Sequence, residues 1–315
     1  MSLNRGLIAV ALTAFVSSSS IAGVSKDLPY PSGGDLTGDQ IAEQVYYVNH
    51  FYGFKNYAIE REGRKVTVLL NKTKGQKPKT ITLTRYLNND YPAGDEINAQ
   101  DMAQFHSGKL KGTGMLVTDY SDDAKSQAYA IWLPQLRKIR RFAQPGHDDS
   151  WGGSDFTFGD VTLRKPQHET HENLGKAKFD ECLGAMEVKK NERGKYTQDL
   201  PGPYCIKDRD VYKLKSTTKF DNWWYDHRIS YVDAESFADH RTEYFKDGKM
   251  IKVIDRHWKR FADAKDPRNQ YWGYWYGTTL DTEHETWAVI PEGVTKVNQD
   301  LDARFWSEAT LRSEE

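Results

Sequence analysis

Residues 65–86 read KVTVLLNKTKGQKPKTITLTRY, and their pattern decides the fold class. Two runs within this stretch, 65–70 and 80–86, are rich in β-branched residues and alternate in polarity. Such alternation is typical of antiparallel strands that bury one face and expose the other. We therefore expect two strands of an antiparallel sheet here.

The same style of sequence continues along the chain. A turn signal, Asp247-Gly248, separates two of the later runs and is typical of a β-hairpin. The further strands that we expect are 111–117, 129–133, 139–142, 204–215, 225–232, 241–245, 250–257, 271–279 and 285–290.

Helical patterns are few. Thr37 is a suitable N-cap for a helix whose apolar stripe is formed by Ile41, Val45, Val48 and Tyr52. A short helix over 99–106, capped by Asn98, and a C-terminal helix bearing Leu301, Phe305 and Leu311 are also expected. With about eleven strands, two or three helices and no βαβ alternation, the sequence predicts an α+β fold with one large, strongly curved antiparallel sheet. We expect this single domain to span 37–315, after a Pro/Gly/Ser-rich arm at 24–36.

The composition excludes two classes of protein and raises one question. The 44 basic and 45 acidic residues nearly cancel, which argues against a dedicated nucleic-acid binder. A charged content of 28% excludes a polytopic membrane protein. The 13 Phe, 9 Trp and 18 Tyr residues are unusually many for so polar a chain. These rings either fill a sheet-rich core or form a binding surface.

Residues 1–23 have the three parts of a secretory signal peptide. Arg5 supplies the positive charge, 7–16 is apolar, and small residues follow up to Gly23. A short buried helix is the alternative, whereas a spanning helix needs a longer run. We expect an exported mature protein that begins near Gly23 or Val24.

The two cysteines can be interpreted together with this export signal. Cys182 and Cys205 lie in one irregular stretch, and in an oxidising compartment an even number of cysteines suggests a disulfide. Two free buried thiols or a redox pair are the alternatives, and a Cys-x-x-Cys spacing is absent from the sequence.

No motif in the sequence favours catalysis. His168 and His171 are spaced differently from the two histidines of a zinc-protease helix, and we interpret 168–172 as a solvated loop or strand edge. The chain also lacks a Gly-x-Ser-x-Gly elbow, a phosphate-binding loop and a dinucleotide fingerprint. We therefore expect a protein that is not an enzyme and that holds neither a metal nor a cofactor.

A cluster of cations precedes two aspartates. Arg137, Arg140 and Arg141 are expected on or beside a strand, and Asp155 and Asp160 follow in the next loop. Arg–carboxylate pairs between them would form a structural clamp that holds the loop to the strand. The alternative is that one cation meets an anionic ligand head group or a partner protein.

These residues resemble a known family, the exported outer membrane lipoprotein-sorting proteins of Gram-negative bacteria. That family is a divergent branch of the LolA/LolB lipoprotein-carrier superfamily. The first half of its motif resembles Trp132, Pro134, Arg137, Arg140 and Arg141, and the second half resembles Gly153, Ser154, Asp155, Phe156, Phe158 and Asp160. Weaker similarities at 111–114, 225–233 and 244–249 extend the resemblance from about residue 36 to residue 311.

The resemblance implies an incomplete β-barrel whose open side is closed by helices and whose concave face forms an apolar cavity. It also implies a periplasmic protein that carries a lipid, a lipoprotein or another hydrophobic cargo between the inner and outer membranes. An inner-membrane exporter of the resistance-nodulation-division type and an outer-membrane acceptor are the implied partners.

The cavity of such a carrier would be lined by aromatic rings. Our candidates are Trp132, Phe156, Phe158, Trp224, Tyr231, Trp272 and Trp275, and ordinary core packing is the alternative role for each. Two other functions remain open at this point. One is a non-catalytic accessory subunit of an envelope complex, whose groove binds a partner protein. The other is a hydrolase of an envelope polymer.

Overall fold

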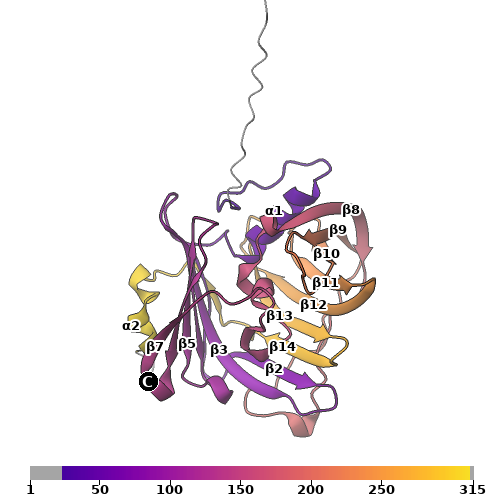
Figure 1. The fold of residues 1–315 in the computed structure, drawn as a ribbon. Coiled ribbons are helices and arrows are strands. Elements are labelled where there is room, and N and C mark those ends of the chain that lie inside the picture. Colours follow the sequence, from indigo (N-terminus) through magenta and orange to yellow (C-terminus); the bar gives the residue numbers. More distant parts are fainter. Residues whose placement is uncertain (1–22, 313–315) are drawn as a thin grey trace, which may run out of the picture.

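The computed structural model describes residues 23–312, and Figure 1 shows their fold. A strongly curved antiparallel sheet dominates, with helix α1 (Gly38–Asn49) over one end of its concave side and helix α2 (Glu308–Arg312) against its outer face. The predicted signal peptide lies, apart from Gly23, outside the described residues. Within 23–312, no helix combines the length and the apolar character that a membrane crossing requires.

The sheet has fifteen strands in the described residues. They are β1 (Asn56–Ile59), β2 (Thr67–Thr73), β3 (Lys79–Asn88), β4 (Ile97–Phe105), β5 (Gly114–Tyr120), β6 (Ala128–Leu133), β7 (Lys138–Phe142), β8 (Glu169–Phe179), β9 (Arg209–Thr218), β10 (His227–Asp233), β11 (Asp239–Lys246), β12 (Lys249–Arg260), β13 (Gln270–Thr279), β14 (His284–Val289) and β15 (Thr295–Val297). The short helical turns are η1 (Gly108–Leu110), η2 (Pro134–Leu136), η3 (Trp151–Gly153), η4 (Gly159–Leu163), η5 (Pro166–His168), η6 (Lys190–Glu192) and η7 (Ala303–Phe305).

The order of the strands explains why the sheet stays open. From one edge to the other the order is β7-β6-β5-β4-β3-β2-β14-β13-β12-β11-β10-β9-β8, and β1 pairs with β3 and β15. The edge strands β7 and β8 follow one another in the sequence, yet within residues 23–312 no ladder of backbone hydrogen bonds joins them. The connection between them, 143–168, instead passes over the concave side (Figure 1). The predicted curved, incomplete barrel with few helices is therefore confirmed.

Local signals explain the best-predicted elements. The Thr37 hydroxyl accepts a hydrogen bond from the Gln40 amide at 3.2 Å, and the Gln40 side chain accepts one from the Thr37 amide at 2.9 Å. This capping box starts α1 where the sequence predicts it. Asp247 and Gly248 both have positive φ, as the tight hairpin between β11 and β12 requires.

The predicted helix over 99–106 is wrong, and the predicted strand number is too low. This stretch forms most of β4, paired with β3 and β5, because its two ladders outweigh the helix propensity of its Ala, Gln and Met residues. Strands β1 and β15 were not predicted, and for β8 only a strand edge at 168–172 was considered. Strand β8 is an edge strand with many charged residues, so its composition resembles that of a loop.

Two segments cover the convex face of the sheet. Residues 180–208 pack Leu183, Met186 and Ile206 against Trp287 and other strand residues, in what we call the first outer cluster. The C-terminal segment packs Trp306 and Leu311 against β4–β6 in a second outer cluster. Side chains on the convex face are thus buried without reaching the concave side.

The predicted disulfide is confirmed and lies in the first of these segments. Cys182 and Cys205 are bonded, and backbone hydrogen bonds flank them from Leu183 to Tyr204 and from Ile206 to Glu181. The bond closes a loop that has little regular structure of its own.

Replacing both cysteines by alanine should lower the free energy of unfolding by about 3 kcal/mol, because the unfolded chain is then no longer constrained. Urea unfolding measures the loss, and reduction of the native protein should reproduce it. Equal stability of the oxidised and reduced proteins would show that the bond contributes nothing.

Candidate functional site

The candidate site lies on the concave face, where one segment divides the interior. We call residues 150–163 the inner segment. It runs between the two walls of the sheet, and its Val161 and Thr162 border two compartments that also share Trp272 and Trp275. One compartment is apolar and the other is polar.

Asp155 fixes the inner segment to β13 and β14. Its carboxylate lies 2.6 Å from His284 Nδ1, 2.5 Å from the Thr279 hydroxyl and 2.8 Å from the Thr286 hydroxyl. The Asp155 amide also donates to the Thr286 hydroxyl at 2.8 Å. These partners lie more than a hundred residues further along the chain. Their contacts hold the inner segment against β13 and β14.

Asp160 forms a second, fully buried anchor. Its carboxylate lies 2.7 Å from Lys252 Nζ on β12 and 2.9 Å from Arg164 Nη2, and it accepts a hydrogen bond from the Tyr244 hydroxyl. Burial alone would raise the pKa of Asp160, but Lys252 and Arg164 outweigh burial and hold that pKa well below its usual value. Asp160 is therefore a charged carboxylate at neutral pH.

The predicted pairing of these aspartates with the arginines near β7 is wrong. Arg137, Arg140 and Arg141 are exposed, and Arg141 pairs with Glu308 of α2 at 2.7 Å. The physical reason is that β7 is an edge strand, whereas the inner segment turns toward the opposite wall. The second half of the motif is nevertheless a structural anchor.

Gly153 and Ser154 shape the turn that precedes Asp155. Gly153 has a φ of 74°, a left-handed conformation that favours glycine. The Ser154 hydroxyl donates to the Trp151 carbonyl at 2.5 Å. Together they close the loop that places Asp155 and Phe156 on the interior.

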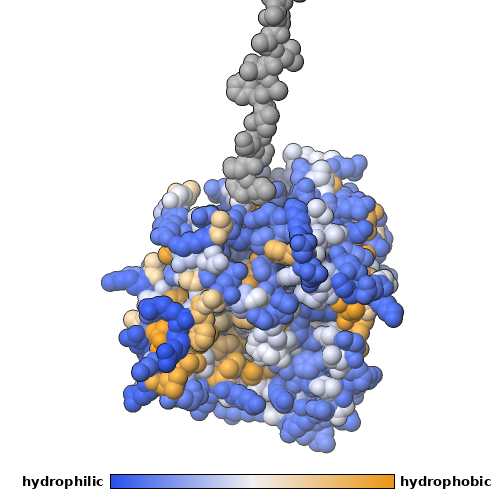
Figure 2. All heavy atoms as spheres, viewed as in Figure 1, coloured by the Kyte–Doolittle hydropathy of each residue, from blue (hydrophilic) through white to orange (hydrophobic). Residues whose placement is uncertain are grey.

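The apolar compartment lies between the inner segment and the wall formed by β2–β6. Figure 2 shows apolar surface recessed between this wall and the centre of the molecule. The cavity volume is about 80 Å³, room for only a few water molecules. The apolar lining residues include Leu69, Leu83, Ala103, Met115, Val117, Tyr129, Trp151, Phe156, Phe158, Val161, Trp272, Trp275, Ala288 and Ile290.

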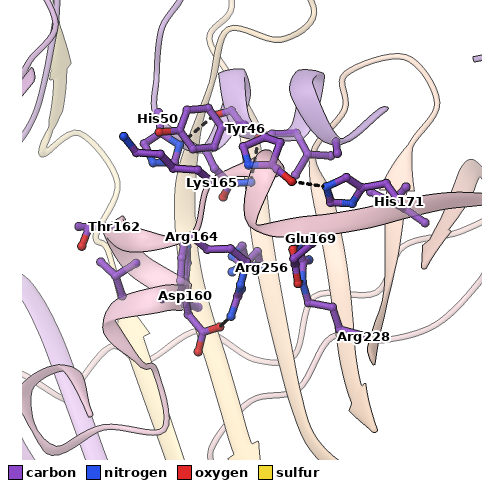
Figure 3. Close-up of a pocket in the computed structure, with 18 of the residues that line it drawn as sticks. Tyr46, His50, Asp160, Thr162, Arg164, Lys165, Glu169, His171, Arg228 and Arg256 are labelled. Atoms are coloured by element: carbon purple, nitrogen blue, oxygen red, sulfur yellow. Dashed lines mark hydrogen bonds and ion pairs between the residues drawn. The ribbon is translucent and has the colours of Figure 1, made fainter. Parts of the chain in front are cut away.

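The polar compartment lies between the inner segment, α1 and the strands of the other wall (Figure 3). Glu169 at the start of β8 is 3% exposed, pairs with Arg228 at 2.5 Å and accepts a hydrogen bond from the Tyr225 hydroxyl at 2.9 Å. Burial would raise the pKa of Glu169, but Arg228 and Arg164 lower it to about 2. Arg256 pairs with Asp239 at 2.6 Å. The interior of this wall is thus a network of buried ion pairs.

This network was not predicted from the sequence. For 168–172 we expected a solvated loop or a strand edge; residues 169–172 do lie in the edge strand β8, but Glu169 is buried. One sequence signal for buried charges lies on β12. Lys252 and Arg256 are each two residues from the buried Ile254, so all three side chains lie on the same face of the strand. Nothing in the sequence identifies their carboxylate partners.

The seven aromatic candidates fall into three groups. Phe156, Phe158, Trp272 and Trp275 line the apolar compartment. Trp224 stacks on Tyr244 in the concave core and lines neither compartment. The expectation does not hold for Trp132 and Tyr231, which pack in the two outer clusters because their strand positions face the convex side.

A β-bulge explains why Trp272 and Trp275 share one face. Trp258 pairs with Trp272 and His257 with Tyr274, so Gly273 is an extra residue in β13. A Cβ atom at Gly273 would lie 2.7 Å from His257 Nδ1, so any other residue there would force the imidazole or the strand to shift. The bulge turns both indoles inward and leaves Tyr274 in the first outer cluster.

His50 makes the stability of this region sensitive to acid. Its ring stacks on Tyr46, and burial lowers its pKa from 6.5 to about 4. Because folding lowers the pKa of His50, the unfolded chain takes up a proton at a higher pH than the folded chain does. The contribution of His50 to stability is therefore complete above pH 6.5 and is lost as the pH falls toward 4. Between pH 7 and pH 5 the loss from His50 should be about 2 kcal/mol.

Urea unfolding of the native protein and of His50→Gln at both pH values measures this contribution. The variant should lose less stability on acidification, since the other titrating groups are common to both proteins. Equal losses would show that His50 titrates normally.

The fold and this interior define a class of protein in which the concave face of an open, curved antiparallel sheet encloses a partly apolar cavity. Three solved structures share the fold of this chain. A DUF1329 family protein from Desulfovibrio piger is 13% identical, with a TM-score of 0.63 over 87% of this chain and 97% of that one. A putative outer membrane lipoprotein-sorting protein domain from Vibrio parahaemolyticus is 14% identical, with a TM-score of 0.63 over 87% and 98%. A LolA superfamily protein from Nitrosomonas europaea is 10% identical, with a TM-score of 0.52 over 88% and 100%.

These similarities confirm, at the level of the fold, the resemblance to outer membrane lipoprotein-sorting proteins. A family model described as an uncharacterized protein also matches residues 98–184, which include all of β4 except its first residue, β5–β8 and the inner segment. No curated protein matches the chain.

Proposed function

We propose that the protein is a non-enzymatic periplasmic carrier that holds the apolar part of a lipid-like molecule on its concave face. The observation that carries the proposal is the apolar compartment, which is lined by rings and aliphatic side chains on the inside of a LolA-type sheet. Each methylene group that leaves water for such a site gains about 0.8 kcal/mol. The predicted signal peptide supports export, and we propose transfer between the inner and outer membranes.

The inner segment gives the carrier a means of reversible binding. Phe156, Phe158 and Val161 already occupy part of the concave space, and the remaining cavity is small. An acyl chain therefore enters only if these side chains move. Burial of the ligand then replaces burial of these side chains, so loading and release are close in free energy.

We propose the two partners that the family resemblance implies. A resistance-nodulation-division exporter in the inner membrane would supply or receive the cargo, and an outer-membrane acceptor would complete the transfer. Cross-linking in intact cells, followed by identification of the captured proteins, tests both partners.

Binding itself is tested with the delipidated protein and a fluorescent fatty acid. We expect saturable uptake with one site per chain, and quenching of the fluorescence of Trp272 and Trp275, which border the cavity. A protein that takes up no fatty acid, but retains an envelope protein stoichiometrically, would refute the carrier and identify an accessory subunit.

A further inference from the structure

The polar compartment contains buried N–H groups that have no partner. Arg256, Trp272 and Trp275 line it and are 4%, 6% and 5% exposed. Arg256 Nε, Trp272 Nε1 and Trp275 Nε1 have no hydrogen-bond acceptor among the described residues. Buried donors normally find an acceptor, because leaving one unpaired costs free energy. A ligand that carries acceptors could pair with these three donors, which belong to residues that line one compartment.

The charges beneath the compartment favour a negative ligand. Asp160 is shared by Lys252 and Arg164, whereas Glu169 is held by Arg228. The charged residues that line the compartment are four cations, Arg164, Lys165, Arg228 and Arg256, and two carboxylates, Asp160 and Glu169. Two of these cations also pair with carboxylates outside the lining, Arg256 with Asp239 and Lys165 with Asp123.

The two carboxylates do not oppose an anion strongly. Both oxygens of Glu169 accept hydrogen bonds from Arg228, and Tyr225 donates a further one. Asp160 is similarly surrounded by Lys252, Arg164 and the Tyr244 hydroxyl. Burial lowers the pKa of Lys252, because desolvation of its ammonium outweighs the attraction of Asp160.

The two compartments adjoin each other across shared lining residues. Trp272 and Trp275 line both of them, as do Val161 and Thr162 of the inner segment. One molecule can thus place its apolar chain on one side of the indoles and its polar end on the other. We propose that the polar compartment is a subsite for the anionic carboxylate or phosphate head group of an amphiphile whose acyl chain lies in the apolar compartment. This inference rests on the proposed carrier function.

His50 offers the head group a hydrogen-bond acceptor. Its Nδ1 donates to the Tyr46 carbonyl at 2.9 Å, so Nε2 of the neutral ring is an acceptor, and no described residue donates to it. A hydroxyl or amide donor beside the anionic group fits this atom.

Calorimetric titration of the delipidated full chain tests the subsite with three probes that share one chain length. The probes are tetradecanoate, tetradecyl phosphate and methyl tetradecanoate. We expect both anions to bind at least tenfold more tightly than the neutral ester, and the tighter anion identifies the head-group class. Equal affinities for all three would overturn the head-group subsite and leave the carrier intact. Binding of none would overturn the carrier as well.

Two variants assign the preference to the unmatched donors. Trp275→Phe removes an indole N–H, and Arg256→Lys keeps the charge beside Asp239 but removes Nε. Each should reduce the preference for the anions over the ester several-fold. Trp287→Phe is the matched control, because Trp287 Nε1 is also buried without a partner but lies in the first outer cluster. An unchanged preference in both cavity variants, or an equal loss in the control, would overturn the assignment.

Discussion

Replacing Asp160 by asparagine should lower the free energy of unfolding by about 3–5 kcal/mol. The change removes the carboxylate that compensates Lys252 and Arg164, whose side chains are 4% and 12% exposed. An amide cannot balance two buried cations, and desolvation of an unpaired charge is expensive. The loss should therefore appear in urea unfolding as a large shift of the midpoint at an unchanged slope.

Asp302→Asn is the matched control for this prediction. Asp302 also pairs with an arginine, Arg304, but both side chains are largely exposed. Exposed pairs contribute little, so this variant should stay within about 0.5 kcal/mol of the native protein. If Asp160→Asn loses no more than Asp302→Asn, the anchor of the inner segment is not energetically important.

Filling the apolar compartment should weaken ligand binding by about 100-fold. Ala288 on β14 lines the compartment and is only partly buried, so a phenylalanine there can extend into the cavity. Excluding about four methylene groups of an acyl chain costs about 3 kcal/mol of binding free energy. Fluorescent fatty-acid titration of Ala288→Phe measures the effect, and its melting temperature shows whether the fold is retained.

Ala177→Phe gives the corresponding control. Ala177 is a partly buried alanine on β8 that packs against the first outer cluster, away from the compartment. Its replacement should leave fatty-acid affinity within about twofold of the native value. Full affinity in Ala288→Phe with an intact fold would place the ligand elsewhere.

Much of the fold could be predicted because its signals are local. The alternation in 65–70 and 80–86, the capping box at Thr37 and the Asp247-Gly248 turn each depend on neighbouring residues, and each forms as expected. Strand β4 could not be predicted in this way. Its residues favour a helix, and only the ladders on both sides make it a strand.

The site was less predictable because its contacts are distant in sequence. Asp160 and Lys252 are 92 residues apart, and the pairing depends on the path of the inner segment across the sheet. Trp132 and Trp275 look equivalent as strand tryptophans. They differ because the C-terminal segment covers the convex face at Trp132, whereas the bulge at Gly273 turns Trp275 inward.

Native mass spectrometry of the protein purified from the periplasm of its own cells tests the carrier most directly. We expect a population of chains that carry one additional mass, which is released on denaturation and identified as an acyl-containing anion. Only bare protein, or a stoichiometric complex with another envelope protein and no lipid, would contradict it.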